Sequence, residues 1–536
     1  MHGCRTLAIV LGLALSVMIG YWLAGTAMPQ RPAETAAAPS AVDTPRAVPT
    51  EPEIKFRSGE RKPGFRSDDE ALEAGALPGQ RALIFKDRKT MEKFLAKLGD
   101  RVKLLGRIDA LNALHVGFLD PADLAALLAG DEELAMIFPA YVPEPKPGEI
   151  QDGVVGVGGN LLRLLGITGD NSQWGKGVLV AILDTGVSPH SALGGKITTL
   201  NLVPMATDLA AWNGHGTAVA SLVIGKAGLT PGVAPGANAL SIRIANDEGV
   251  SNSRLIAEGI VAAVDGGANP IIISMGSTGD SALVRSAIAY ANEAGVVIVA
   301  AAGNYGSDQI SFPAANEGVT AIGTVDARGT RLAFSNTGDA LAAVAPGLEV
   351  NAAWTGDQAV AFTGTSASTP IVGGGIVAAM SPGNGIRRSA TAARDLVLSK
   401  LDDGGQPGAD PMLGGGTLNM ARVMNAGTPG IYDAAVAANY FVDGFAPELQ
   451  VVIQNCGTEM LLNAGVTVTT PNGTVPLNIT TLAPDQIQTF TIALPPSIWK
   501  GNEGVRFDSS VKLSGSQIDA NPQNNRRVET YAPAVP

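Results

Sequence analysis

The sequence predicts an α/β protein in which a doubly wound parallel sheet is preceded by a small α+β unit and followed by an all-β unit. Three observations support this prediction. Continuous apolar strands alternate with helical stretches in the middle of the chain, a compact β-α-β-β-α-β pattern precedes them, and short strands without helices follow. With 536 residues the chain is too long for a single core, so several domains are expected.

The composition is that of a folded chain that does not bind polyanions. Hydrophobic residues make up 46% of the sequence and charged residues 16%, whereas disorder needs fewer apolar and more charged residues. The formal net charge of -12 argues against nucleic acid as a partner, because phosphate binding uses a surplus of Lys and Arg. The two cysteines, Cys4 and Cys456, provide no internal disulfide framework, because Cys4 precedes any folded domain.

Residues 1–27 are expected to direct export. An uncharged run from Leu7 to Gly25 exceeds the roughly 7–15 residues of a signal-peptide core and approaches the ~20 that span a bilayer. Tyr21 and Trp22 suit a membrane interface, while the small residues of "GTAM" suit a signal peptidase. A cleaved signal peptide and a membrane anchor through residues 7–25 both remain open, so the expected location is secreted, periplasmic or cell-surface.

The next part of the chain predicts a linker and then a small folded unit. Residues 28–78 are rich in Pro and Ala without an apolar period, as is typical of a spacer. Residues 79–149 contain strands at "RALIFKD", "RVKLLGRI", "NALHVGFL" and "ELAMIFPAYV". One helix has Met91 and Phe94 at helical spacing, and a second begins at Asp120 as N-cap. The order is that of a split βαβ, or ferredoxin-like, unit.

Residues 150–427 predict the parallel sheet, and residues after 427 predict a sandwich. The strands "GVLVAILD", "PIIISMG" and "GVVIVAAAGN" are apolar throughout, as in a sheet covered on both faces, and such sheets bind ligands at the carboxyl ends of their strands. After a linker at 428–444, residues 445–536 predict a small immunoglobulin-like β-sandwich. Its strands are "LQVVIQN", "GVTVTT", "TVPLNITTL", "QTFTIALP", "VRFDSSVKL" and "RRVETY".

Among four histidines, His215 is the candidate general base. His2 precedes the export segment, His115 lies on a strand of the small unit, and His190 is read as a loop side chain. His215, in "NGHGTAVASLVIG", precedes a run of small residues that predicts a tightly packed helix. A lone histidine is more often structural than catalytic, so this stretch alone does not decide its role.

Three further residues each have a structural and a catalytic interpretation. Asp184 ends the strand "VLVAILD", where it either caps the following turn or orients an imidazole. Ser366 starts the helical stretch "ASTPIVGGGIVAAM", either as an N-cap, with Pro370 in the first turn, or as a nucleophile whose neighbouring N–H groups hold an oxyanion. Asn304 either satisfies loop backbone or donates its amide to an acyl oxygen.

The order of these residues along the chain favours catalysis. Asp184, His215 and Ser366 follow the Asp, His, Ser order of the subtilisin class. The stretches "AILDTGV", "NGHGTAVAS", "AAAGNYG" and "GTSASTPIVGG" resemble the Asp, His, Asn and Ser motifs of subtilisin-like serine proteases, and "SFPAAN", "FSNTGD" and "VAPGLEV" resemble connecting motifs, from about 155 to 427. The resemblance implies a serine endopeptidase with that triad and Asn304 in the oxyanion hole.

The same resemblance implies a substrate-binding edge. "SMGS", beginning with Ser274, Met275 and Gly276, resembles the strand that binds substrate backbone by β-addition, although it can also be an ordinary strand end. Tyr305 borders the same pocket by position, with no charged residue beside it. Protein or peptide substrates with an apolar or uncharged residue before the scissile bond are therefore expected.

The resemblance extends to both ends of the chain. Residues 79–149 look like a propeptide, an intramolecular chaperone and inhibitor that is cut near "YVPEPKPGEIQDGV", and the C-terminal sandwich looks like a bacterial cell-adhesion-related (CARDB-like) domain. Cys456 is expected to be a free structural thiol, since nothing basic surrounds it in the sequence. The resemblance makes no cofactor certain: structural calcium stays open, but "GKAGLTPGVAPG" lacks the asparagine-containing loop with which many subtilisins bind it.

Two other functions compete with the protease interpretation. A surface adhesion or scaffold protein with a vestigial protease fold is the alternative, although all four chemical positions are filled. An esterase would have the order Ser, Asp, His and a "GxSxG" elbow, which the Ser366 motif does not match.

Overall fold

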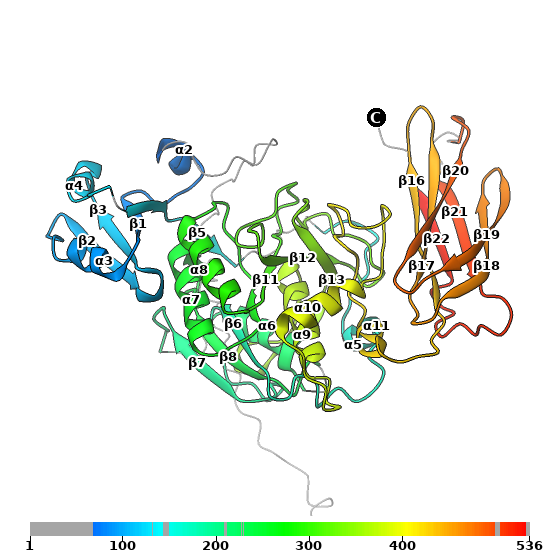
Figure 1. Ribbon diagram of the computed structural model, residues 1–536, viewed down its shortest axis with the longest axis horizontal. Coiled ribbons are helices and arrows are strands. Elements are labelled where there is room, and N and C mark those ends of the chain that lie inside the picture. Colours follow the sequence, from blue (N-terminus) through cyan, green and yellow to red (C-terminus); the bar gives the residue numbers. More distant parts are fainter. Residues whose placement is uncertain are drawn as a thin grey trace, which may run out of the picture. The chain divides into compact units, whose positions relative to one another are not determined.

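The computed structural model describes residues 68–130, 132–142, 150–207, 212–226, 228, 230–498 and 504–531. Three units follow one another along the chain: an N-terminal unit up to residue 142, a central unit from 150 to 427, and a C-terminal unit from 428 (Figure 1). The predicted export segment 1–27 and most of the predicted linker lie outside the described residues. Within the described ranges, no helix is long and apolar enough to cross a membrane.

The N-terminal unit has the predicted element order. It contains β1 (Gln80–Phe85), α3 (Arg88–Leu95), β2 (Val102–Ile108), the 3-10 turn η1 (Asp109–Leu111), β3 (Ala113–Phe118), α4 (Pro121–Ala125) and β4 (Glu132–Met136). The strands form one antiparallel sheet in the order β2-β3-β1-β4. Asp120 caps α4 as expected, since its carboxylate accepts the Ala122 N–H at 2.8 Å.

The predicted linker ends earlier than residue 78. Residues 68–73 form helix α2 (Asp68–Glu73), and Ala71 and Ala76 are buried. The segment "DDEALE" combines acidic residues for the first turn with good helix formers, but six residues are too few to show a helical period in the sequence.

The central unit confirms the predicted parallel sheet. Its seven strands lie in the order β13-β12-β11-β10-β6-β8-β7, and every neighbouring pair is parallel. They are β6 (Leu179–Asp184), β7 (Ile197–Asn201), β8 (Asn238–Arg243), β10 (Ile271–Ile273), β11 (Ile298–Ala301), β12 (Val319–Val325) and β13 (Leu341–Pro346).

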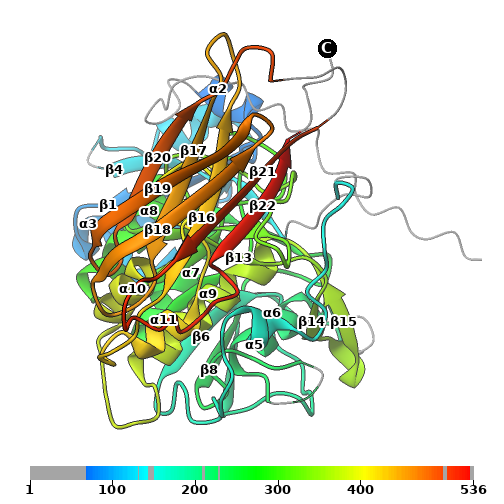
Figure 2. The ribbon, with the colours of Figure 1, turned by 90° about the vertical axis from the view of Figure 1, so that its right-hand side faces the viewer.

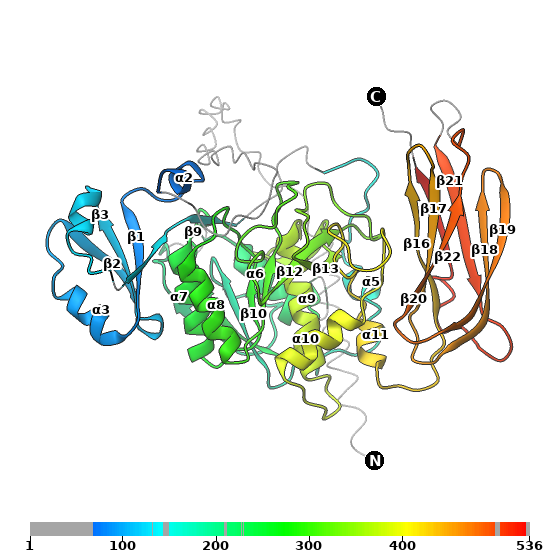
Figure 3. The same cartoon turned by 45° about the horizontal axis from the view of Figure 1, so that its top comes forward.

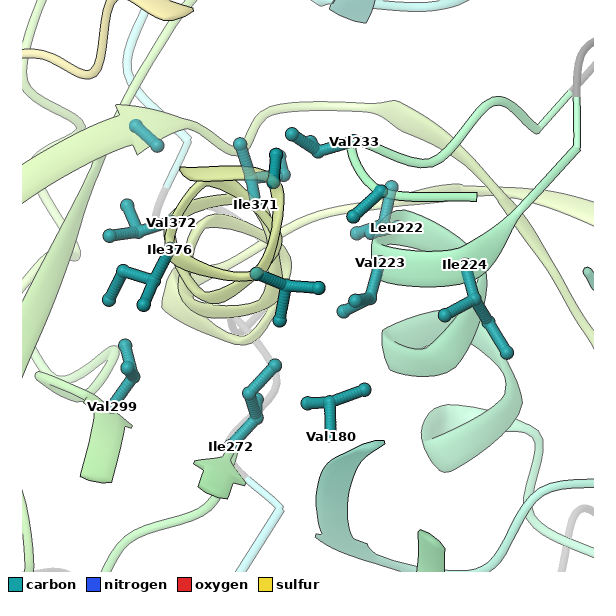
Figure 4. Close-up of a cluster of buried hydrophobic side chains, with 14 of the residues drawn as sticks. Val180, Leu222, Val223, Ile224, Val233, Ile272, Val299, Ile371, Val372 and Ile376 are labelled. Atoms are coloured by element: carbon teal, nitrogen blue, oxygen red, sulfur yellow. The ribbon is translucent and has the colours of Figure 1, made fainter. Parts of the chain in front are cut away.

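Helices cover both faces of this sheet, as Figures 1 and 3 show. On one face α6 (His215–Ile224) and α9 (Thr365–Met380) pack on Val180, Ile272 and Val299, with the side chains of α9 pointing into that cluster (Figure 4). On the other face α7 (Ser253–Asp265) and α8 (Ala282–Glu293) pack on the intervening strand residues, such as Ala181 and Ile273. Because both faces are covered, the inner strands β6, β10 and β11 are almost entirely apolar, whereas the edge strand β7 (Ile197–Asn201) is mostly exposed.

Shorter elements complete the central unit. They are α5 (Leu161–Leu164), β9 (Val250–Asn252), α10 (Ala390–Ser399), α11 (Met420–Asn425), and the hairpin of β14 (Val350–Ala353) and β15 (Ala359–Phe362) with η3 (Thr355–Asp357) between its strands. Strand β9 pairs with β5 (Pro139–Tyr141), the last described strand of the N-terminal unit.

The C-terminal unit consists of two antiparallel sheets (Figure 2), in the orders β16-β17-β20 and β19-β18-β21-β22. Its strands are β16 (Ala434–Val442), β17 (Glu448–Asn455), β18 (Leu461–Thr470), β19 (Gly473–Leu482), β20 (Ile487–Ala493), β21 (Val505–Lys512) and β22 (Arg526–Tyr531). Aromatic rings of both sheets, including Phe441 and Phe507, meet in its core.

Strand β16 corrects the predicted linker at 428–444. Its sequence "AAVAANYFV" is rich in alanine and has no alternation of apolar and polar residues. The first six of its residues are all buried, so the strand shows no polar face by which a half-buried strand is recognised.

Charged side chains join the C-terminal unit to the central unit. Arg422 of α11 is 4% exposed and bonds to Asp402 at 3.1 Å and to Asp485 at 3.0 Å, and Lys400 also pairs with Asp485. The expectation that nothing basic lies near Cys456 is wrong, because Arg422 interacts electrostatically with it. Burial and Asp402 nevertheless raise the pKa of the Cys456 thiol well above its ordinary value, which fits a structural thiol.

Candidate active site

Asp184 and His215 form a buried pair at the carboxyl end of the sheet. Asp184 is the last residue of β6, and His215 is the first residue of α6. The His215 Nδ1 atom lies 2.9 Å and 3.0 Å from the two carboxylate oxygens of Asp184, and the side chains are 0% and 1% exposed. Because a carboxylate only accepts, Nδ1 is the nitrogen that donates to Asp184, and Nε2 is the ring nitrogen left for another partner.

The turn-capping interpretation of Asp184 also holds. One carboxylate oxygen accepts the N–H of Thr185 at 2.7 Å, so the same side chain stabilises its own turn and orients the imidazole. Thr185 continues this connection, since its hydroxyl accepts the Gly216 N–H at 3.1 Å and donates to the Asn213 carbonyl at 3.1 Å. The loops that carry the acid and the histidine are thereby fixed to each other.

His215 is held at the start of α6 by a side-chain hydrogen bond and by close packing. The Asn213 side chain accepts the His215 N–H at 2.9 Å. A Cβ atom at Gly216 would lie 2.3 Å from the Gly186 carbonyl oxygen, so only glycine allows the helix to approach this closely. The Phe362 ring meets the imidazole edge-on, with 5.1 Å between ring centroids. Within the described chain the Nε2 atom is buried and has no hydrogen-bond partner.

Ser366 is not the cap of its helix, contrary to one of the two predicted roles. The N-cap of α9 is Gly364, with φ 131°, and Ser366 is the second helical residue. Its hydroxyl donates to the Ser274 carbonyl at 3.1 Å, and the Ser274 hydroxyl donates to the Ser366 carbonyl at 3.2 Å. That carbonyl lacks its usual helical partner because Pro370, four residues on, has no N–H. Pro370 thus lies in the second turn, not in the first.

Asn304 is fixed against the start of the same helix. Its Oδ1 atom accepts both the backbone N–H and the hydroxyl of Thr365, each at 2.9 Å. A Cβ atom at Gly364 would lie 2.7 Å from the Asn304 Nδ2 atom, so the amide nitrogen lies over the bare Cα of the helix cap. The Asn304 amide and the first residues of α9, among them Ser366 with its own backbone N–H, therefore lie close together.

The predicted substrate-binding residues form an edge that already carries a strand. Gly276 accepts the Tyr141 N–H at 2.9 Å and donates to the Tyr141 carbonyl at 3.0 Å. On the other side, the Val142 N–H donates to the Gly249 carbonyl at 3.0 Å, and β5 pairs with β9. Met275 is fully buried beneath this edge. Residues 139–142 therefore lie as an extended strand between two segments of the central unit.

Tyr305 follows Asn304, and its backbone contacts reveal a residue that sequence reasoning missed. The buried Asn336 accepts the N–H groups of Tyr305 at 2.9 Å and Ser307 at 3.2 Å, and its own N–H donates to the Gly303 carbonyl at 3.0 Å. Asn336 thus holds the turn that presents Asn304. The motif "FSNTGD" contains it, but the sequence gives no sign that its amide binds this turn.

His190, expected to be a loop side chain, lies apart from the Asp184–His215 pair. His190 forms no hydrogen bond with Asp184, His215 or Ser366. Its ring contacts the Gln358 carbonyl at 2.8 Å and Asp357, as a structural loop residue does.

In the described part of the chain, no group of three or more His, Cys, Asp or Glu side chains could hold a metal ion.

Comparisons with known proteins agree with this geometry. The family model described as Peptidase_S8, Subtilase family, matches residues 175–416. The thermostable alkaline protease of Halalkalibacterium halodurans is 36% identical over 205 residues, which cover 38% of this chain and 56% of that protein. Alkaline elastase YaB of a Bacillus species is 32% identical over 311 residues, covering 54% of this chain and 78% of that protein. Subtilisin Savinase of Lederbergia lenta is 36% identical over 205 residues, covering 37% and 75%. This chain belongs to the subtilase family.

Proposed function

We propose that this chain is an exported serine endopeptidase, made as a zymogen, that hydrolyses peptide bonds through an acyl-enzyme. The observation that carries the proposal is the His215 imidazole, held by Asp184 at Nδ1 while its buried Nε2 has no partner. Most buried side-chain nitrogens are hydrogen-bonded, and a general base needs one nitrogen free to take a proton. Among the described residues, the buried Nδ1 atom of His115 also lacks a partner, so it is the pairing with Asp184 that distinguishes His215.

In the proposed mechanism, His215 takes the proton of Ser366 as the serine attacks the substrate carbonyl. The Ser366 hydroxyl, which rests on the Ser274 carbonyl, turns toward the imidazole for this step. Asp184 stabilises the imidazolium, and the Asn304 amide and the Ser366 backbone N–H receive the negative charge on the acyl oxygen. His215 then protonates the leaving amine, and water hydrolyses the acyl-enzyme.

Residues 79–149, which include most of the N-terminal unit, are proposed to act as propeptide, inhibitor and folding aid. The support is the strand 139–142, which occupies the edge at Gly276 and Gly249 in the way an extended substrate would. Cleavage in the junction after this strand would release the catalytic domain, residues 150–427. Residues 1–27 would serve export, as a cleaved signal peptide or as a membrane anchor.

The proposed substrates are proteins and peptides with an apolar or uncharged residue before the scissile bond. No charged residue stands beside Tyr305 or within the segment from Ser274 to Gly276. A cleavage profile dominated by Arg, Lys or Glu at that position would contradict this preference.

One observation favours a second candidate, an inactive surface scaffold: the Ser366 hydroxyl bonds to Ser274 and not to His215. Expression of the wild type, Ser366→Ala and Ser368→Ala separates the two. Ser368 is the matched control, since its buried hydroxyl bonds only to the Ala345 carbonyl at 2.8 Å. Mass spectrometry should find self-cleavage between about 141 and 153, and a fluorophosphonate probe should label the chain, in the wild type and Ser368→Ala only. Intact, unlabelled chains in all three would favour the scaffold.

A further inference from the structure

We propose that the central unit holds a subsite for an aromatic side chain, formed by Gly279 and Ser253. It takes the residue that lies, in a bound extended peptide, three positions before the residue whose backbone pairs with Gly276. Phe138 of the N-terminal unit occupies it in this structure. The inference rests on the proposed function, because it names a substrate class for the same edge: extended peptides with an aromatic side chain at that position.

The backbone of Phe138 is bound by one residue of the central unit. The Phe138 N–H donates to the Ser253 hydroxyl at 3.1 Å, and the Ser253 N–H donates to the Phe138 carbonyl at 2.9 Å. Ser253 directly follows β9 and begins α7. The edge that binds an extended chain therefore continues past the paired strands and includes the residue that enters the subsite.

The ring of Phe138 lies on a bare glycine. A Cβ atom at Gly279 would lie 2.0 Å from Cδ1 and 2.2 Å from Cε1 of Phe138, distances that no side chain tolerates. Gly279 has no left-handed backbone that would itself require glycine, so space for the ring is what the position provides. The Phe138 side chain is 0% exposed, so its ring is fully enclosed in this structure.

The strand presents alternate residues to the central unit. Phe138 and Ala140 are both 0% exposed, while Pro139 and Tyr141 between and after them are half-buried. Ala140 packs into the apolar cluster that includes Ile256 and Met275, and its own side chain is only a methyl group. The two inward positions therefore differ in size, with a small residue at one and an aromatic residue at the other.

The outer face of the ring is covered by the N-terminal unit itself. Ala71 and Ala76, in and after α2, pack on Phe138, and the Thr278 hydroxyl donates to the Ala74 carbonyl at 3.4 Å. A peptide substrate has no such cover, so it gains only the contact with Gly279. We therefore expect the subsite to strengthen binding of the N-terminal unit more than binding of a peptide.

A peptide experiment tests the subsite on the active enzyme. The peptide of residues 136–142, "MIFPAYV", and its Phe→Ala form are compared as competitive inhibitors of casein hydrolysis by the mature enzyme. The wild-type peptide should bind at least fivefold more tightly. In Gly279→Ala the two inhibition constants should agree within twofold. In Gly169→Ala, where a Cβ meets nothing within 4 Å, the difference should persist. Equal inhibition constants in the wild type would overturn the proposal.

Hydrogen exchange tests the same subsite without any activity. In the full-length Ser366→Ala chain, the amides of Tyr141 and Val142 report whether the strand stays bound. Both Phe138→Ala and Gly279→Ala should speed their exchange at least tenfold, and Gly169→Ala should leave it unchanged. Unchanged exchange in Gly279→Ala would overturn the subsite even in an active protease. Faster exchange in a chain that cleaves nothing would keep the subsite and reject the proposed function.

Discussion

Arg243 lies directly beside Asp184 in the parallel sheet, because β8 pairs with β6 and these two residues are partners in the register. Its side chain is 1% exposed, donates to the Thr185 carbonyl and pairs with Asp247 at 3.0 Å. Asp247 in turn bonds to Asn213, the residue whose side chain accepts the His215 N–H. A buried cation thus connects the loops that carry the acid and the base of the proposed triad.

Replacing this cation should destabilise the central unit. Arg243→Met leaves Asp247 without its charge partner in a mostly buried position, which typically costs about 3–5 kcal/mol. Urea unfolding of the Ser366→Ala chain, followed by tryptophan fluorescence, measures the loss. Arg394→Met is the control, because Arg394 and Asp395 form a more exposed pair worth roughly 1 kcal/mol or less. Equal losses in the two variants would contradict the connecting role of Arg243.

Asn304→Leu should lower kcat by about 10²–10³-fold with little change in KM, the size reported for the oxyanion-hole asparagine of subtilisin. Because Asn304 also holds Thr365, a loss of activity could come from a displaced helix start. Asn304→Asp distinguishes the causes: it keeps the acceptor for Thr365 but removes the donor. Full activity in Asn304→Asp would show that the amide does not bind the oxyanion.

The sequence predicts the parallel sheet and the pairing of Asp184 with His215, because buried strands and ordered motifs are local patterns. It does not predict Asn336 or Arg243, whose roles depend on contacts that only the folded chain creates. Asn336 bonds to backbone about 30 residues away, and Arg243 lies beside Asp184 through a strand pairing that spans 59 positions. Neither contact leaves a pattern in the neighbouring residues.

The misplaced linkers have a different cause. The strand Ala434–Val442 is buried partly by residues far along the chain, such as Phe507, and Ala71 of the helix Asp68–Glu73 is buried against Phe138. Their own sequences carry no clear period. The role of Ser366 as N-cap was wrong because Gly364, with its positive φ, starts the helix without a side-chain cap. Local sequence shows where a helix begins only to within a residue or two.

The N-terminal unit should lose stability as pH falls. Burial, together with Arg254, lowers the pKa of His115 from 6.5 to about 4. Between these values the unfolded state binds more protons than the folded state, so stability decreases from about pH 6.5 down to 4, by about 3 kcal/mol in total. Hydrogen exchange of β1 and β3 amides in the Ser366→Ala chain measures this loss. His115→Gln should flatten the profile between pH 6.5 and 4.5, and an unchanged profile would assign the loss to other groups.

The C-terminal unit should respond in the opposite direction. The pKa of Asp433 is raised from 3.8 to about 6, by burial first and also by the nearby Asp519 and Asp402, against the Asn524 hydrogen bond and Arg422, which lower it. Between pH 3.8 and 6 the folded state binds more protons than the unfolded state, so this group stabilises the unit at low pH and that contribution is lost as pH rises through 6.

Exchange of β16 and β17 amides should therefore be slower at pH 5 than at pH 7.5, after correction for the intrinsic rate. Asp433→Asn should remove the difference, whereas Asp443→Asn, at an exposed position of the same unit, should preserve it. If the β16 and β17 amides of the wild type exchange faster at pH 5 than at pH 7.5 after the same correction, Asp433 is not protonated in the folded unit.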